Sequence, residues 1–430
     1  MPQTSTESAA EAKASWRRIV RNAASILLGD AAGEIFTGYA ILLAATSLGP
    51  AGFGQLSEAQ AFMDPFDALA GLGLGNVAIT VAARRGGCDG NLRGTVGGVR
   101  AVSTVIATSI GLAIAFATGR TALLPLLLLI SAGTLLAPVN LVALLPFQYR
   151  QAIHRRVALP FVIGIIRLGT AYLAYWLLNK PIGYQCSALA TACVAAALNY
   201  WWAHRTYREK LVFDRSLAVA LLKLGWPAAA LEFIVALYSR ASYFLLHDAG
   251  PVVQGQYAAA DRLMKPLMAV AGAVFISSLP TVAGVAARRD FASMRASFHR
   301  NVWRVAIGCA AMCAGAWVLA GWLLNRFAPA YSEAIWPFRV LSIGTVFMFL
   351  NMLSTTYIVA LGRFRTIMIV AGCNLIVYLL LATQLIPRHG ALGAALSTSL
   401  MEAINTVIQL WLVSRLLKTA SRTTEGEPVP

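Results

Sequence analysis

The stretch Gly49-Pro50-Ala51-Gly52-Phe53-Gly54-Gln55 recurs 201 residues later as Gly250-Pro251-Val252-Val253-Gln254-Gly255-Gln256. The same offset continues downstream without a gap, and it aligns Met63 with Met264 and Pro65 with Pro266. Small apolar residues match easily by chance, but Gly-Pro, Gly-Gln and Met-x-Pro at one fixed offset favour duplication. The sequence therefore predicts two similar halves.

Composition places the chain in a membrane. Of its 430 residues, 58% are hydrophobic and 12% are charged, whereas soluble domains are about one quarter charged. Apolar runs of the ~20 residues needed to cross a bilayer follow one another along the chain. The net charge of +17 lies in short clusters between these runs, which argues against nucleic-acid binding.

The apolar runs predict an all-α polytopic membrane protein with twelve transmembrane helices in two six-helix bundles. The predicted spans lie near residues 22–46, 57–83, 99–118, 122–146, 157–178, 183–203, 217–246, 257–284, 302–325, 335–360, 365–386 and 391–415. The corresponding domains are an N-terminal tail (1–21), an N-terminal bundle (22–210), a C-terminal bundle (211–416) and a C-terminal tail (417–430).

Lysine and arginine residues set the orientation, because positively charged loops stay in the cytoplasm. Alternate segments between the predicted spans, together with both tails, carry 26 Lys and Arg residues, and the opposite segments carry only Arg120, Lys180, Arg326 and Arg388. We therefore expect a multi-pass protein of a bacterial inner (cytoplasmic) membrane with both termini in the cytoplasm.

Each predicted half has an even number of spans, so the halves are parallel repeats. Transporters built in this way bind their substrate between the repeats and work by alternating access. Short outward loops leave little room for an extracytoplasmic catalytic domain, so we expect no enzyme activity.

Several stretches carry a family resemblance. In the first half they are Arg21-Asn22, Leu48-Gly49-Pro50 with Phe53-Gly54, and Gly71-Leu72-Gly73-Leu74-Gly75. In the second half they are Lys223-Leu224-Gly225-Trp226-Pro227, Tyr238-Ser239-Arg240 and Gly255-Gln256-Tyr257-Ala258-Ala259-Ala260. Together they resemble the polysaccharide-biosynthesis flippases, the Wzx-type branch of the multidrug/oligosaccharidyl-lipid/polysaccharide exporter superfamily. Members often carry an acid shortly after the position of Arg240, where this chain has Ser242, so a coupling role for that acid does not carry over.

The resemblance implies a MATE-like, two-bundle protein that flips undecaprenyl-pyrophosphate-linked oligosaccharide repeat units to the periplasmic leaflet for surface polysaccharide or lipopolysaccharide synthesis. Its expected partners are the lipid-linked oligosaccharide, the membrane, and a polysaccharide polymerase and glycosyltransferases. Nucleic acid is not among them.

Ionisable residues inside spans are costly and usually face a cavity or a partner. We predict that five cations line a cavity for the anionic pyrophosphate or acidic sugars, since Arg suits bidentate phosphate contacts; the alternative is internal ion pairing. They are Arg167, Arg240, Arg262, Lys265 and Arg339.

Candidate ion-coupling residues are Asp30, Glu34, Glu232 and Asp64. Asp30 and Glu34 share one helix face at i and i+4 and could hold a proton or a sodium ion, or pair with an arginine. Asp64 and Lys265 are related by the repeat offset and could form a structural or gating pair. No cofactor, metal site or catalytic group is expected.

Two other functions stay open. A MATE-type multidrug or cation antiporter predicts an acid-rich cavity, which the excess of embedded bases disfavours. A membrane-bound enzyme of envelope synthesis needs a cluster of His or acidic residues at one interface, but the five histidines are scattered along the chain.

Overall fold

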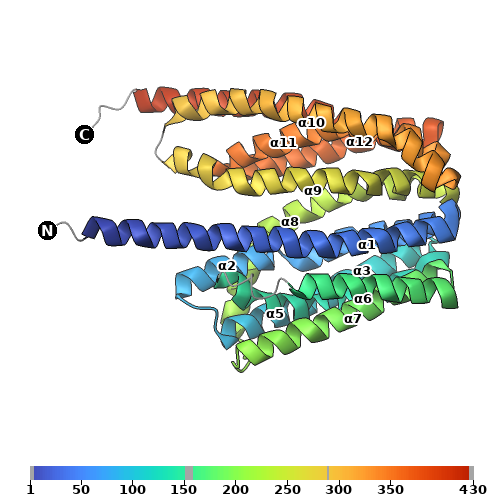
Figure 1. The fold of residues 1–430 in the computed structure, drawn as a ribbon, viewed down its shortest axis with the longest axis horizontal. Coiled ribbons are helices and arrows are strands. Elements are labelled where there is room, and N and C mark those ends of the chain that lie inside the picture. Colours follow the sequence, from blue (N-terminus) through green and yellow to red (C-terminus); the bar gives the residue numbers. More distant parts are fainter. Residues whose placement is uncertain (1–3, 151–157, 288–289, 426–430) are drawn as a thin grey trace. The chain divides into compact units, whose positions relative to one another are not determined.

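The computed structural model describes residues 4–150, 158–287 and 290–425, and within these it is helical, without strands (Figure 1). The helices are α1 (Thr4–Gly71), α2 (Leu74–Arg85), α3 (Gly90–Ala117), α4 (Leu124–Thr134), α5 (Ala137–Tyr149), α6 (Ala158–Leu177), α7 (Pro181–Thr206), α8 (Arg215–Leu245), α9 (Pro251–Ala287), α10 (Phe291–Phe327), α11 (Ile335–Ala360) and α12 (Phe364–Glu425). Three short 3-10 helices cover Thr121–Leu123, His247–Ala249 and Pro329–Ala334. The all-α class is confirmed.

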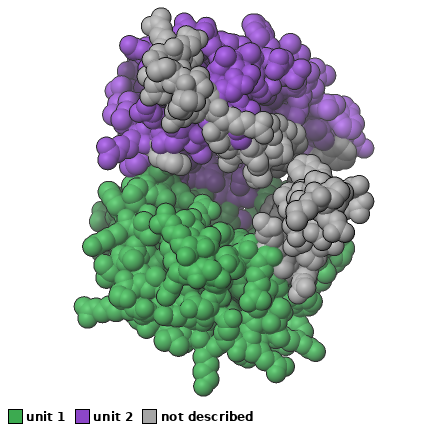
Figure 2. Space-filling model, turned by 90° about the vertical axis from the view of Figure 1, so that its left-hand side faces the viewer, with its two compact units in different colours: residues 1–48, 59–233 green, residues 49–58, 234–430 purple. Residues whose placement is uncertain are grey.

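The chain forms two compact units, drawn in two colours in Figure 2. Unit 1 contains residues 1–48 and 59–233, and unit 2 contains residues 49–58 and 234–430. Residues 49–58, which begin at the Gly49 bend, thus pack with the C-terminal unit. Helix α8 is divided between the two units. The predicted domain boundary at 210/211 stays a prediction.

Helix α1 contains two helices joined at Gly49, whose backbone angles (φ 66°, ψ 179°) are non-helical. Ser47 Oγ lies 2.6 Å from the hydroxyl of Tyr184, and Gln60 Nε2 donates to Gln185 Oε1 at 3.2 Å. A straight helix would separate residues 47 and 60 by about 20 Å, so the chain reverses at Gly49.

A second reversal divides α12 at Gly390, where φ is 53° and ψ is −126°. Beyond it, Ser399 Oγ donates to the carbonyl of Val340 at 2.9 Å, and Asn351 Nδ2 donates to Glu402 Oε2 at 2.6 Å. The second part of α12 therefore lies along α11, as Figure 1 also shows.

Nine helical segments of the described residues are long and apolar enough to cross a membrane. Two of the nine, Ile35–Arg85 and Arg365–Ala420, contain the reversals at Gly49 and Gly390, so each of them runs along more than one helix. Most side chains of α9 beyond Lys265 lie outside the described residues. The chain is a multi-pass membrane protein, and the exact number of twelve spans stays a prediction.

The sequence repeat corresponds to a repeated backbone conformation. Gly250 (φ 88°, ψ 163°) adopts nearly the same angles as Gly49, and each precedes a proline that opens a helix. Non-glycine residues rarely adopt this conformation. Proline suits the first helical turn because its missing N–H would have no partner there.

Within unit 2, the two repeated helix starts pack directly on each other. A Cβ added to Gly54 would collide with the carbonyl oxygen of Pro251, and one added to Gly255 would collide with the carbonyl oxygen of Pro50. The two contacts are equivalent under the repeat, since the offset of 201 residues relates Gly54 to Gly255 and Pro50 to Pro251. Glycine is required at both positions by close approach of backbone atoms.

We predict that Gly54→Ala and Gly255→Ala each lower the free energy of unfolding by about 1–3 kcal/mol, the usual cost of overpacking. The opposing atoms are backbone carbonyls, which cannot move aside by changing rotamer. The measurement is thermal unfolding of the purified protein in detergent. Gly75→Ala is the matched control because its Cβ would meet open space. Equal unfolding temperatures for Gly54→Ala and Gly75→Ala would contradict the prediction.

Candidate functional site

The candidate site in unit 1 begins at a break in the helix that runs from Pro50. Helix α1 ends at Gly71, Leu72 (φ 49°) and Gly73 (φ 57°) adopt left-handed angles, and α2 begins at Leu74. Irregular backbone at membrane depth is tolerated only where it is buried in protein or lines a cavity. The glycine-rich stretch 71–75, which the sequence places inside an apolar helix, is therefore a structural break.

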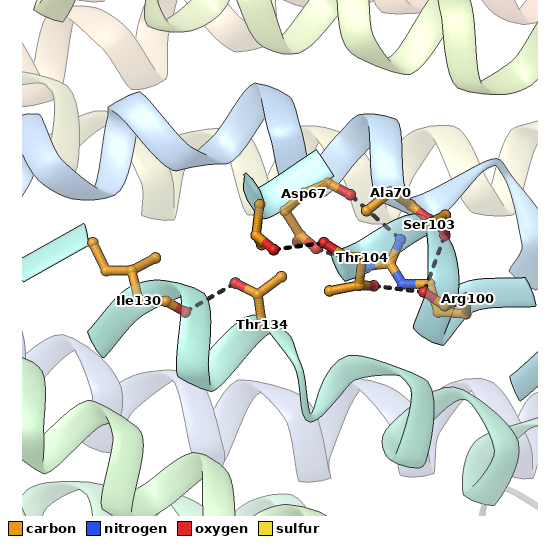
Figure 3. Close-up of polar contacts among 8 residues, drawn as sticks. Asp67, Ala70, Arg100, Ser103, Thr104, Ile130 and Thr134 are labelled. Carbon is orange, nitrogen blue, oxygen red and sulfur yellow. Dashed lines mark hydrogen bonds and ion pairs between the residues drawn. The ribbon is translucent and has the colours of Figure 1, made fainter. Parts of the chain in front are cut away.

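Side chains of α3 satisfy the polar groups of this break (Figure 3). Arg100 donates from Nη2 to Asp67 Oδ1 at 2.6 Å and from Nη1 to the Asp67 carbonyl at 3.3 Å. Ser103 Oγ donates to the carbonyl of Ala70 at 2.7 Å. The last carbonyls of a helix have no intrahelical partner, so Arg100 and Ser103 cap the broken end.

A second carboxylate lies close to Arg100. A Cβ added to Gly71 would lie 2.9 Å from Arg100 Nη1 and 3.5 Å from Glu232 Oε2. The side chain of Arg100 is 9% exposed, whereas that of Asp67 is 52% exposed. The site thus holds one buried cation that is paired with the exposed Asp67, and a second carboxylate, Glu232, lies nearby.

Helix α8 holds Glu232 near the break through close backbone packing. A Cβ on Gly225 would collide with the carbonyl oxygen of Leu72, and one on Gly73 would lie 2.6 Å from the Cβ of Ala228. Small residues on both sides therefore bring the two elements together. Gly73 and Gly225 belong to two of the stretches that carry the family resemblance.

A cavity of about 310 Å³ opens beside Asp67. Its other polar walls are Thr134, Asn140 and Gln185, and the remainder is small or apolar. Asn140 Oδ1 accepts from Asn199 at 2.9 Å, and Gln185 Oε1 accepts from Gln60 at 3.2 Å. Cavities of this size hold small ligands, and neutral amides with one carboxylate suit a hydroxyl-rich or cationic group.

In unit 2, Arg240 and Arg262 lie in one cluster. Arg240 Nη1 lies 3.5 Å from Asp261 Oδ2, and the hydroxyl of Tyr243 donates to the same oxygen at 3.1 Å. The guanidinium of Arg262 lies 5.2 Å from the ring centroid of Phe53. Arg240 is therefore ion-paired, as the alternative interpretation of the embedded cations expected.

Ser242, where family members often carry an acid, is buried and joins two tyrosines. Its hydroxyl donates to the Tyr257 hydroxyl at 2.9 Å and lies 2.6 Å from the Tyr378 hydroxyl. These hydroxyls connect α8, α9 and α12. In this chain Ser242 therefore holds helices together through hydrogen bonds between neutral hydroxyl groups.

The other predicted substrate-binding cations lie on three further parts of the chain. Arg339 on α11 lies 5.1 Å from the Trp336 ring centroid and 5.5 Å from that of Trp317, and its Nε is buried without a hydrogen-bond partner. Lys265 is exposed on α9, and Arg167 is half-buried on α6. All five roles stay predictions.

Among the predicted ion-coupling residues, Glu232 lies beside Arg100 and Asp64 is half-buried. The side chains of Asp30 and Glu34 lie outside the described residues. Across the described residues, no group of three or more His, Cys, Asp or Glu side chains could hold a metal ion.

Sequence reasoning missed the central cation of unit 1. Arg100 was counted with the cytoplasmic charges because the apolar run begins beside it, but α3 begins at Gly90, where the Asp89 side chain caps the helix. An Asp before a Gly-Asn-Leu sequence is a helix-start signal, and it places Arg100 about 15 Å along the helix. The cavity residues Thr134, Asn140 and Gln185 carry no comparable signal.

A family model described as "Polysaccharide biosynthesis protein" matches residues 19–284, which include α3, the helix break and the Gly49 and Gly250 repeats. The chain belongs to the polysaccharide biosynthesis protein family. A comparison with curated proteins finds no match.

The fold of this polysaccharide biosynthesis protein resembles that of solved transporters. A multidrug resistance MATE family transporter of the MOP superfamily, in its inward-facing conformation, gives a TM-score of 0.78 at 13% identity, covering 94% of this chain and 99% of that one. An outward-facing conformation gives 0.64 at 13% identity, with 94% and 96% covered. These identities establish a MATE-like fold and leave the cargo open.

A MOP superfamily transporter from Pyrococcus furiosus gives a TM-score of 0.69 at 14% identity, covering 94% of this chain and 96% of that one. It is reported with a binding pocket of reverse polarity that suggests a different function. All three solved structures are transporters that share this fold.

We predict that Arg100→Leu destabilises this family member by about 1–3 kcal/mol, because it removes the charged hydrogen bond from Arg100 to Asp67. Asp67→Asn keeps an oxygen acceptor toward Arg100 and should cost less. Thermal unfolding in detergent compares the two, with the exposed Arg85→Gln as control. A larger loss for Asp67→Asn would contradict the capping role of Arg100.

Proposed function

We propose that the protein flips undecaprenyl-pyrophosphate-linked oligosaccharide repeat units from the cytoplasmic to the periplasmic leaflet by alternating access. The single observation that carries this proposal is the polysaccharide biosynthesis family match across residues 19–284 on a chain with a MATE-like fold. A transporter in polysaccharide synthesis must move the sugar across the membrane, and the cytoplasmic membrane carries sugars on a lipid during their assembly.

The cavity beside Asp67 supports a sugar-bearing cargo. Its neutral donors and acceptors, Thr134, Asn140 and Gln185, suit hydroxyl groups, which form several weak bonds rather than one strong one. A substrate that must leave on the other side of the membrane is best held by such contacts.

The embedded arginines support an anionic group on the same cargo. Arg262 and Arg339 lie on aromatic rings, which hold the guanidinium without cancelling its charge. Arg240 is already paired with Asp261, so its contact with a phosphate requires that the pair opens. We propose all five cations, Arg167, Arg240, Arg262, Lys265 and Arg339, as phosphate contacts.

Ion coupling is proposed for Glu232, Asp64, Asp30 and Glu34, driven by protons or sodium. Glu232 carries the strongest structural support, because it lies near the ion pair of Arg100 and Asp67. In this proposal, protonation of Asp67 would free Arg100 to interact with Glu232. The proposal places both termini in the cytoplasm, beside the glycosyltransferases that supply the cargo and opposite the polymerase that consumes it.

Deletion of the gene should cause complete lipid-linked repeat units to accumulate in the cytoplasmic leaflet, with loss of surface polysaccharide. The measurement is extraction of undecaprenyl-linked sugars with an assay for the leaflet that holds them, and the control is complementation with the intact gene. Unchanged polysaccharide with greater sensitivity to cationic drugs would overturn the proposal and favour the antiporter.

At equal protein levels, we expect Arg339→Gln and Arg167→Gln each to lower surface polysaccharide by about tenfold, because one charged hydrogen bond is worth about 1.5–3 kcal/mol. Arg84→Gln, at the exposed end of α2, is the control and should keep full synthesis. Normal synthesis in both variants would remove these residues from the binding site.

A further inference from the structure

A second cavity of about 600 Å³ lies within unit 1, where the start of α3 meets the end of α7 and the segment that follows it. Its ionisable and aromatic walls include Arg93, His204, Arg208, Glu209, Lys210 and Tyr200. None of these residues has a place in the transport site described above. The cavity carries three permanent cations and one carboxylate, so an anion is the ligand that its charge favours.

Arg93 is the central observation. Its side chain is only 5% exposed, and its Nε donates to the carbonyl of Val142 at 3.4 Å. Its Nη1 is buried without a hydrogen-bond partner, since Glu209 Oε2 lies 3.8 Å away. A buried donor on a charged group is costly to leave without a hydrogen-bond partner, and a bound anion would remove that cost.

The segment that forms the other wall is fixed on α3 by close backbone packing. Glycines 90, 94 and 98 lie at intervals of four and share one face of the helix. A Cβ on Gly90 would collide with the carbonyl oxygen of Lys210, one on Gly94 with that of Val212, and one on Gly98 would lie 2.8 Å from the ring of Phe213.

Hydrogen bonds complete this attachment. The N–H of Val212 donates to the Gly90 carbonyl at 3.2 Å, and the N–H of Asp214 donates to Thr95 Oγ1 at 2.9 Å. The hydroxyl of Ser216, followed by the N–H of Leu217, holds the pKa of Asp214 below its ordinary value. The wall is therefore built before any ligand arrives, which lowers the entropic cost of binding.

The remaining lining groups fit a phosphate. Arg208 and Lys210 are exposed and can close over a ligand held by Arg93. His204 stacks on Tyr200, with ring centroids 5.9 Å apart and an 8° angle between the planes. The planar guanidinium of arginine suits hydrogen bonds to phosphate oxygens. In Arg93, the Nη1 group has no hydrogen-bond partner and is available for such a bond.

We propose that this pocket binds a phosphate group, carried either by an anionic phospholipid or by a soluble phosphorylated compound, with Arg93 as its buried contact. The pocket lies among the basic segments expected on the cytoplasmic side, where basic pockets between membrane helices bind lipid headgroups. Glu209 is the group that the phosphate displaces from Arg93. This site is separate from the cavity beside Asp67 and does not depend on the proposed cargo.

The test uses the full-length protein purified in a neutral detergent. Three probes are added separately: phosphatidylglycerol, glycerol 3-phosphate and the zwitterionic phosphatidylcholine. The readouts are the unfolding temperature and the number of bound probe molecules by native mass spectrometry. The double variant Arg208→Gln/Lys210→Gln removes exposed cations of the pocket, so it avoids the folding risk of replacing Arg93.

The matched control is Arg205→Gln, an exposed arginine of the same helix end that lies on the Trp201 ring and not on the pocket wall. The double variant should weaken binding about tenfold or more, since one charged hydrogen bond is worth at least a factor of ten. Glu209→Gln should strengthen it, because it removes the competing carboxylate.

The probes separate the two sources of phosphate. Binding of phosphatidylglycerol alone identifies a lipid headgroup, and binding of glycerol 3-phosphate as well identifies a soluble phosphorylated ligand. Binding of phosphatidylcholine as strongly as the anionic probes, no binding of either anionic probe, or equal losses in the double variant and in Arg205→Gln would overturn the proposal.

Discussion

The reciprocal contact between Gly54 and the Pro251 carbonyl, and between Gly255 and the Pro50 carbonyl, is the constraint on which the fold of unit 2 depends. It removes ten residues of the first half from unit 1 and packs them with the second half. The chain therefore crosses between the units at Leu48/Gly49 and again at Glu58/Ala59. No residue with a side chain fits where two backbones approach this closely, which explains why both halves have glycine at these positions.

Small residues also allow the close backbone packing that builds the site in unit 1. Gly73 and Gly225 let α8 approach the end of the broken helix, and this approach brings Glu232 to Arg100. A continuous helix would have no free carbonyls for Arg100 and Ser103 to bind. The break, its cap and the nearby carboxylates are thus one arrangement, and none of its parts is stable at membrane depth without the others.

The sequence predicted what depends on hydrophobicity and on a visible repeat. The all-α class follows from the apolar runs and the recurrence of Gly49-Pro50 as Gly250-Pro251 from the sequence itself, whereas the reversal at Gly49 is seen only in the structure and the twelve spans stay a prediction. Arg100 was misplaced because its helix begins ten residues before its apolar run. The pairing of Arg240 with Asp261 depends on how α8 meets α9, and no local pattern records that.

The surroundings of the embedded arginines separate two kinds of charge. Arg100 and Arg240 lie on carboxylates, so their charge is balanced and their field at a distance is weak. Arg262 and Arg339 lie on aromatic rings, which stabilise the cation but add no opposing net charge. Arg339 goes furthest in this direction, because its Nε is also buried without a hydrogen-bond partner. A phosphate that reached Arg339 would satisfy a donor that the protein itself leaves unsatisfied.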